Sequence, residues 1–142
     1  DFYWTNVTDP AAPFVGIVEQ SNWALPEEFG GRHLVYLSAY LPPGDARYDM
    51  DAGQLLDHYR PHVQKLFPAF QRDWVLESWA WRAPYAQPVV TTGYRHLRPD
   101  TDTPLTNLKL CTMAQIYPND RQVSNGIDRA RALAEKLVED WG

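Results

Sequence analysis

The sequence predicts an α+β fold, with a mixed, mainly antiparallel sheet of about five or six strands and two principal helices. Short runs of β-branched and aromatic residues, separated by turn residues, dominate residues 2–41. Two longer segments, residues 52–67 and 124–141, repeat apolar residues with the period of an α-helix. A chain of 142 residues, 44% of them hydrophobic, is long enough to bury a core.

Three strands are expected near the N-terminus, at residues 2–7, 14–18 and 33–41. The third is the most convincing, because it is rich in residues that suit a buried, pleated surface. The connections between the three carry polar residues and turn formers such as Pro10. Strands joined in this way most simply form an antiparallel meander.

A helix is expected over residues 52–67, with Asp51 as its N-cap. Pro61 lies inside the pattern and should kink the helix, because proline lacks an N–H and crowds the preceding turn. The apolar positions share one face: Leu55, Leu56, Tyr59, Val63 and Leu66.

A fourth strand is expected at Trp74–Trp81, followed by a connection from Arg82 to Thr106 that is rich in proline and glycine. Two prolines flank Tyr85 and Gln87 and would hold them rigidly, as the lining of a pocket requires. The alternative is an ordinary strand exit in which Arg82 pairs with a surface acid.

The C-terminal segment begins with a strand pattern at residues 108–112, followed by a loop and a helix that starts near Ser124. Ser124 and Asn125 are both good N-cap residues. A capped helix start offers backbone N–H groups and a partial positive charge, which suits a polar or anionic ligand. Many helices have such a start and bind nothing. The apolar face comprises Ile127, Ala130, Ala134, Leu137, Val138 and Trp141.

Composition excludes several classes of function. A formal net charge of -5 argues against a nucleic-acid partner, because phosphate binding needs clustered lysine and arginine. No apolar run is long enough to predict a membrane span, and a single cysteine excludes an internal disulfide and favours a cytoplasmic protein. Cys111 lies between apolar neighbours and is expected to be a buried, inert thiol. Asp1 is not an initiator residue, so we expect a piece of a longer protein.

No catalytic constellation is evident, and the catalytic residues stay unassigned. His58 and His62 have a spacing that can hold zinc, but no third ligand accompanies them, so no metal site is expected. Surface exposure is the simpler interpretation of both side chains.

Two sequence stretches, Trp81–Pro88 and Leu108–Arg121, resemble the C-terminal third of bacterial FAD-dependent oxidoreductases of the amine oxidase/protoporphyrinogen oxidase superfamily. Phe2–Pro10 and Phe14–Glu19 also look like strands of that family's substrate domain. The resemblance implies that residues 1–106 belong to a substrate domain. It implies that residues 107–142 are the returning strand and helix of the FAD-binding domain.

The resemblance further implies a small-molecule substrate and FAD as cofactor, held jointly with an N-terminal FAD-binding portion that this sequence does not contain. FAD bound by these residues alone should be weak or absent. The residues implied at the flavin are Met113, Ser124, Asn125, Gly126 and Ile127. Those implied at the substrate pocket are Arg82, Tyr85, Gln87 and Tyr117.

An alternative is a non-catalytic binding or dimerisation module that keeps the substrate-domain fold. It is motivated by the missing nucleotide-binding half and by Gln122 and Ala130, which stand where the family usually has glycine. This alternative predicts a homodimer, because the helix at residues 124–141 would otherwise expose its apolar face.

Overall fold

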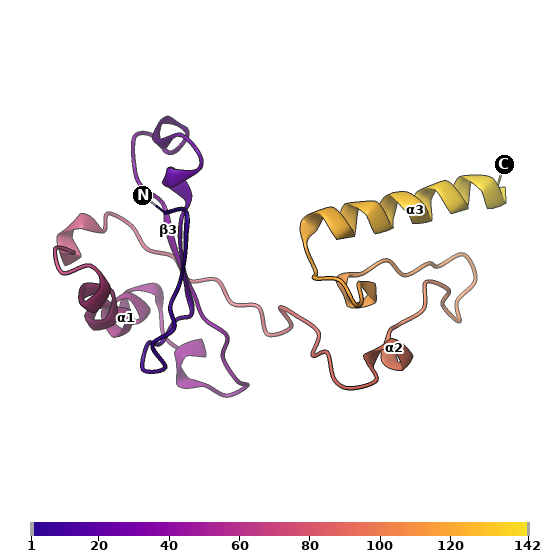
Figure 1. Cartoon of the computed structure of the whole chain (residues 1–142), viewed down its shortest axis with the longest axis horizontal. Helices are drawn as coiled ribbons and strands as arrows, with labels where there is room; N and C mark the ends of the chain where they lie inside the picture. The colour runs from indigo at the N-terminus through magenta and orange to yellow at the C-terminus, as the bar shows by residue number, and fades with distance from the viewer. Residues whose placement is uncertain (1, 142) are drawn as a thin grey trace. The chain divides into compact units, whose positions relative to one another are not determined.

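The computed structural model describes residues 2–141 and divides the chain into two compact units, Asp1–Pro84 and Tyr85–Gly142. The first unit contains a three-stranded sheet and one long helix, and the second contains one long helix, a one-turn helix and irregular chain (Figure 1). The class is α+β, as predicted. No helix within the described residues is both long enough and apolar enough to cross a membrane.

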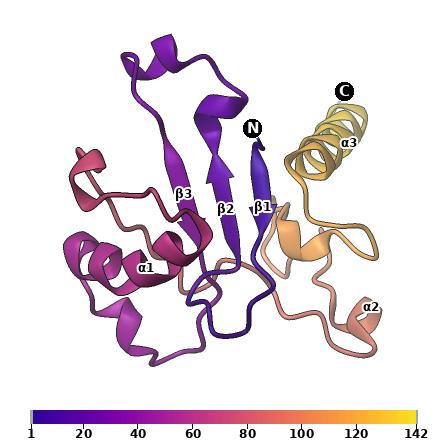
Figure 2. The same ribbon diagram turned by 60° about the vertical axis from the view of Figure 1, so that its left-hand side comes forward.

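The sheet of the first unit is an antiparallel meander in the order β1-β2-β3 (Figure 2). Its strands are β1 (Trp4–Asn6), β2 (Gly16–Glu19) and β3 (Val35–Ser38). Ile17 of β2 is opposite Thr5 on one side and Leu37 on the other. The predicted meander is confirmed, with strands shorter than the sequence pattern.

Helix α1 (Ala52–Leu66) covers one face of this sheet. Its start is a capping box, in which the Asp51 carboxylate accepts from the Gln54 N–H at 2.8 Å and the Gln54 side chain accepts from the Asp51 N–H. The helix runs continuously through Pro61. Its buried face packs on the sheet around a core of Phe14, Ile17, Tyr59 and Val63. The predicted N-cap is confirmed, and so is the apolar face at Leu55, Tyr59 and Val63, whereas Leu66 at the end of the helix is exposed.

Arg47 forms an ion pair with Asp45 in the loop before α1 and a hydrogen bond to the loop before β2. Arg47 donates to both carboxylate oxygens of Asp45, at 2.8 and 2.7 Å, and to the Pro13 carbonyl at 2.9 Å. The hydrogen bonds from the Arg47 side chain, and then from its backbone N–H, lower the pKa of Asp45 from 3.8 to about 2. Asp45 therefore stays charged across the range in which ordinary aspartates are protonated.

This pair predicts a loss of stability in acid. Because the pKa of Asp45 is lowered in the folded state, its contribution to stability is complete above pH 3.8 and disappears as the pH falls through about 2. We expect the free energy of unfolding of the first unit to fall over that range. Asp45→Asn should remove this part of the pH dependence, and Asp49→Asn, at an exposed carboxylate nearby, should keep it. Urea unfolding followed by tryptophan fluorescence measures both, and equal slopes for the two variants would contradict the assignment.

The number of strands is corrected from five or six to three within the described residues. The predicted strands at Trp74–Trp81 and at residues 108–112 do not form: Trp74 ends the 3₁₀ turn Arg72–Trp74, and the described residues of both segments form no ladder apart from a single bridge between Asp102 and Lys109. In the described chain, residues 76–90 make no backbone–backbone hydrogen bond to another segment. Their strand propensity is real, but a strand also needs a partner for its N–H and C=O groups.

The predicted burial of Cys111 is also wrong, because its side chain is exposed. The segment around it forms one side of a hairpin arm, which we define as residues 99–111. Within the arm the Leu110 N–H donates to the Thr101 carbonyl at 2.8 Å, and Lys109 pairs with Asp102 at 2.5 Å. With no strand stacked over it, the arm leaves the thiol open to solvent.

The second unit is built around α3 (Val123–Trp141), with the one-turn helix α2 (Tyr94–Leu97) before the arm. The two principal helices of the prediction are therefore α1 and α3. Because α3 begins at Val123, Ser124 and Asn125 lie inside its first turn and do not cap it. Short 3₁₀ turns complete the chain, at Gln20–Asn22, Pro26–Phe29, Ala46–Tyr48, Arg72–Trp74 and Met113–Gln115.

Candidate functional site

The candidate site lies where a lead-in loop, defined as residues 112–122, turns into the first turns of α3. The loop starts with a capping box of its own. The Gln115 side chain accepts from the Thr112 backbone N–H at 2.9 Å, and the Thr112 side chain accepts from the N–H of Gln115. This local pattern closes the 3₁₀ turn Met113–Gln115 and turns the Gln115 side chain towards the interior.

Gln115 joins three segments of the unit. Its side chain is 1% exposed. The Oε1 atom also accepts from Arg129 Nε at 3.0 Å, and Nε2 donates to the Pro99 carbonyl at 3.3 Å. Arg129 of α3 in turn donates from Nη2 to the Thr101 hydroxyl at 3.0 Å. The loop, the arm and the helix are therefore held together by one buried polar network.

An apolar contact supports the other side of the loop. Tyr94 of α2 is buried and donates its hydroxyl to the Ala114 carbonyl at 2.7 Å. Its ring lies 5.5 Å from that of Tyr117, in a tilted arrangement, and Ile116 is buried beside them in the chain. Tyr117, predicted at the substrate pocket, is thus half-buried against α2.

The first turn of α3 brings two of the predicted flavin residues into contact. A Cβ built on Gly126 would come within 3.1 Å of Met113 Sδ, so the absence of a side chain lets the loop approach the helix. The Gly126 N–H donates to the Gln122 carbonyl at 3.2 Å, so the free N–H groups at this end belong to residues 123–125. Asn125 donates its amide to the Asp120 carbonyl at 2.5 Å, while Ile127 is exposed.

The close approach at Gly126 can be measured as a coupling. Gly126→Ala should gain up to about 1 kcal/mol from helix propensity, but part of the gain is lost because Met113 must shift. In a Met113→Ala background the same substitution should be more stabilising, by about 0.5–1 kcal/mol. Urea unfolding followed by circular dichroism at 222 nm of the two single variants and the double variant tests this. Additive effects would show that the two residues do not contact each other.

The four residues predicted at a substrate pocket have different surroundings. Arg82 belongs to the first unit, where it donates to the Met50 carbonyl, and it is in none of the ion pairs of residues 2–141. Tyr85 is 95% exposed. Gln87 is brought to the lead-in loop, because its Oε1 accepts from Arg121 Nη2 at 2.9 Å. Two cavities, of about 200 and 360 Å³, are lined by none of Arg82, Tyr85, Gln87 and Tyr117.

Three polar residues of the site were missed in the sequence: Gln115, Arg121 and Arg129. The pattern Thr112-Met-Ala-Gln115 is a capping-box signature and could have identified Gln115. Nothing in the pattern indicates Arg129, whose contacts are 14 and 28 residues away in sequence. Arg121 is the most distinctive of the three, because its Nε is buried and has no hydrogen-bond partner among the described residues.

The site therefore offers donors and little else that is reactive. Free backbone N–H groups of the first turn, the partial positive charge of α3 and the guanidinium of Arg121 all favour a polar or anionic group. Within residues 2–141, no group of three or more His, Cys, Asp or Glu side chains is arranged to hold a metal ion. The arrangement can bind and orient a ligand that brings its own chemistry.

The comparisons with known proteins agree with that character. The sequence model of the family described as flavin containing amine oxidoreductase matches residues 14–128. The match includes β2, β3, α1, the arm, the lead-in loop and the first turn of α3. Neither the curated proteins nor the solved structures contain a match to the chain. Because the match extends over most of its length, the chain belongs to the family of flavin-containing amine oxidoreductases.

Proposed function

We propose that the chain contributes the substrate domain and the flavin-facing helix of an FAD-dependent oxidoreductase that oxidises an amine or a neighbouring C–H bond. The observation that carries this proposal is the family match over residues 14–128, which includes the start of α3. FAD, when bound, accepts the two electrons removed from the substrate. The residues of the chain bind and orient the reactants.

The residues present fit a flavin at the start of α3. Helix N–H groups of residues 123–125 and the unpaired Nε of Arg121 are donors, and negative charge develops on a flavin as it is reduced. Gln115 and Arg129 hold the lead-in loop against the helix, so these donors are fixed before a ligand arrives. The residues that we place at the flavin are Met113, Ser124, Asn125, Gly126 and Ile127.

The same proposal assigns the two parts of the chain to two domains of the oxidoreductase. Residues 1–106 would form the substrate-domain portion, and residues 107–142 would return to the FAD-binding domain. The sequence has no Gly-x-Gly-x-x-Gly motif, so the adenine and pyrophosphate would be held by a separate FAD-binding portion. Arg82, Tyr85, Gln87 and Tyr117 are proposed to line the substrate pocket, which would be completed only when that portion is present.

The absorption spectrum of the full-length polypeptide tests the proposal. We expect flavin bands near 370 and 450 nm, about the positions typical of flavoproteins, that bleach when a primary or secondary amine is added without oxygen. A full-length protein without flavin bands, even after reconstitution with FAD, would exclude the proposal. Flavin bands that no amine bleaches would show that the protein binds a flavin but would exclude amines as its substrates.

A substitution at Ser124 tests the contribution of the helix start. Ser124→Asp in the full-length protein places a negative charge beside the proposed flavin, and we expect about two- to fivefold weaker FAD binding. Ser124→Asn, which changes the side chain without adding charge, should bind FAD as the parent does. Equal dissociation constants for all three proteins would show that the flavin does not lie at this end of α3.

A second function is favoured by the exposed face of α3. Val123, Ile127 and Val138 are 76%, 61% and 72% exposed, and Ala130 and Ala134 complete the same stripe. We propose as the alternative a non-catalytic module that dimerises through this stripe. Sedimentation equilibrium of the 142-residue chain distinguishes the two. A dimer that Ile127→Asp dissociates supports the alternative, and a monomer at all concentrations counts against it.

A further inference from the structure

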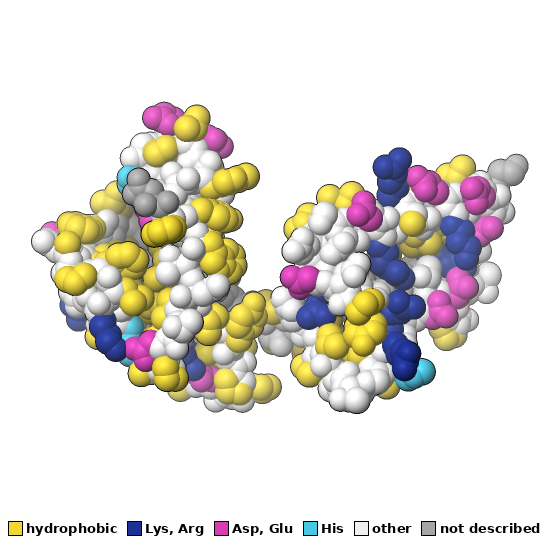
Figure 3. Space-filling view, in the orientation of Figure 1, with side chains coloured by type: hydrophobic (Ala, Val, Ile, Leu, Met, Phe, Trp, Pro, Cys, Tyr) yellow, Lys and Arg dark blue, Asp and Glu magenta, His cyan; other side chains and the backbone are white. Residues whose placement is uncertain are grey.

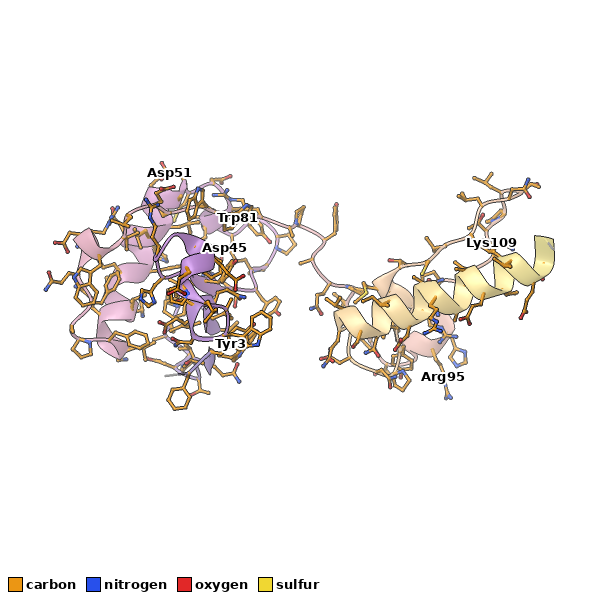
Figure 4. The ribbon with its side chains drawn as sticks, turned by 90° about the horizontal axis from the view of Figure 1, so that it is seen from above. Tyr3, Asp45, Asp51, Trp81, Arg95 and Lys109 are labelled. Atoms are coloured by element: carbon orange, nitrogen blue, oxygen red, sulfur yellow. The ribbon has the colours of Figure 1, made fainter. Side chains whose placement is uncertain are left out.

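A groove of about 360 Å³ lies between the hairpin arm and α3, and it shares Thr101 and Arg129 with the network that holds the lead-in loop. The arm contributes Leu110 and Cys111 to its walls, and α3 contributes Ala132 and Leu133. Figure 4 shows Lys109 on the segment of the arm that runs along this helix. The groove is of a size that holds small organic molecules, and its lining combines charged residues with the apolar side chains of Leu110, Ala132 and Leu133.

Two basic residues of α3 line the groove at different positions along the helix axis. Arg129 and Lys136 both line it, and their spacing of two helical turns separates their backbones by roughly 10 Å. Arg129 uses Nε and Nη2 for Gln115 and Thr101, which leaves Nη1 for another partner. Among the ion pairs of residues 2–141, none includes Arg129 or Lys136.

One of the two acidic side chains of the groove, Asp102, is paired with a lysine. Asp102 pairs with Lys109 at 2.5 Å, and this hydrogen bond, with a smaller contribution from the charge of Lys136, keeps the pKa of Asp102 below its usual value. Asp100 accepts from the neighbouring Thr101 N–H at 2.6 Å. The lining carries two acidic and two basic side chains, and because Lys109 pairs with Asp102, Arg129 and Lys136 face Asp100 as the remaining acidic residue of the lining. Figure 3 shows lysine and arginine side chains on this unit interspersed with aspartate and glutamate.

We propose that this groove binds a small organic anion, a carboxylate with a short aliphatic body. The carboxylate would be held by Lys136 and Arg129 Nη1, and the aliphatic part would lie on Leu110 and Leu133. Both parts of the ligand are needed, because an inorganic anion leaves the apolar side chains in water and a neutral alcohol leaves the cations unpaired.

Cys111 provides a reporter inside the groove, because it is exposed and is the single cysteine of the sequence. Iodoacetate and iodoacetamide alkylate the same thiolate, forming an S–C bond with loss of iodide, and differ in charge. The rate with iodoacetate divided by the rate with iodoacetamide is therefore independent of the reactivity of the thiol and reports the local preference for an anion. We expect Lys136→Gln to lower this ratio about two- to fivefold at low ionic strength.

Arg131→Gln is the matched control, because Arg131 lies on α3 and pairs with Glu135 outside the groove. It removes the same charge and should leave the ratio unchanged. An equal fall in both variants, or no fall in Lys136→Gln, would overturn the proposal. Circular dichroism confirms that both variants keep their helices.

Protection of Cys111 tests the ligand class on the unmodified chain. Hexanoate should slow alkylation by iodoacetamide in a saturable manner, and Lys136→Gln should weaken this protection. Hexan-1-ol and inorganic phosphate at the same concentrations should protect less. Protection by hexan-1-ol equal to that by hexanoate would show that charge has no part. Protection by phosphate equal to that by hexanoate would show that the apolar side chains have none, and either result would refute the proposed class.

Discussion

Replacing Phe14 by alanine is expected to lower the free energy of unfolding of the first unit by about 3–5 kcal/mol. Phe14 is 1% exposed and lies at the centre of the core, with its ring 5.4 Å from that of Tyr59 in an edge-on arrangement. Removing the ring takes away apolar burial and leaves a cavity between β2 and α1 that the short strands cannot close. Much of this unit is loop, so no other buried contact of similar size would compensate.

The matched control is Phe2→Ala, because the Phe2 side chain is largely exposed. It should change the free energy of unfolding by less than about 1 kcal/mol. Urea unfolding followed by tryptophan fluorescence reports both variants. Similar small effects for Phe14 and Phe2 would mean that α1 does not pack on the sheet through Phe14.

Replacing Gln115 by leucine is expected to destabilise the second unit by about 1–3 kcal/mol, because it leaves two partly buried donors without an acceptor. These donors are the Thr112 N–H and Arg129 Nε, at 2.9 and 3.0 Å from Gln115 Oε1. Loss of the network should free the lead-in loop from α3. Hydrogen exchange of the amides in residues 112–122 should therefore accelerate, and circular dichroism should show earlier unfolding of the helix.

Two further variants test whether the loss of stability comes from the hydrogen bonds of Gln115. Gln122→Leu makes the same substitution at an exposed position of the same loop and should be nearly neutral. Gln115→Glu keeps an acceptor for both donors and loses only the bond to the Pro99 carbonyl, so its effect should be smaller than that of leucine. If glutamate and leucine destabilised the unit equally, the network with Arg129 would not be what holds the loop.

The helix that begins the candidate site was predicted, but the contacts that attach it to the rest of the unit were not. The helix start near Ser124 is visible in the sequence, because helical periodicity depends on residues three and four apart. Its contact with Met113 depends on the absence of a side chain at Gly126, and its attachment to the arm depends on Arg129. Hydropathy and capping preferences carry no information about such distant pairs. The proposed pocket residues remain a prediction for the same reason.

The sequence by itself determined the elements whose stabilising contacts are local: the meander β1-β2-β3, the capping box at Asp51, and the two long helices. Only the tertiary structure decided which extended segments become strands, because Trp74–Trp81 has strand propensity but no neighbour to accept its backbone hydrogen bonds. It also decided that Gln115 is buried and Cys111 is exposed. Burial depends on what other parts of the chain lie against a residue, and a local pattern cannot specify that.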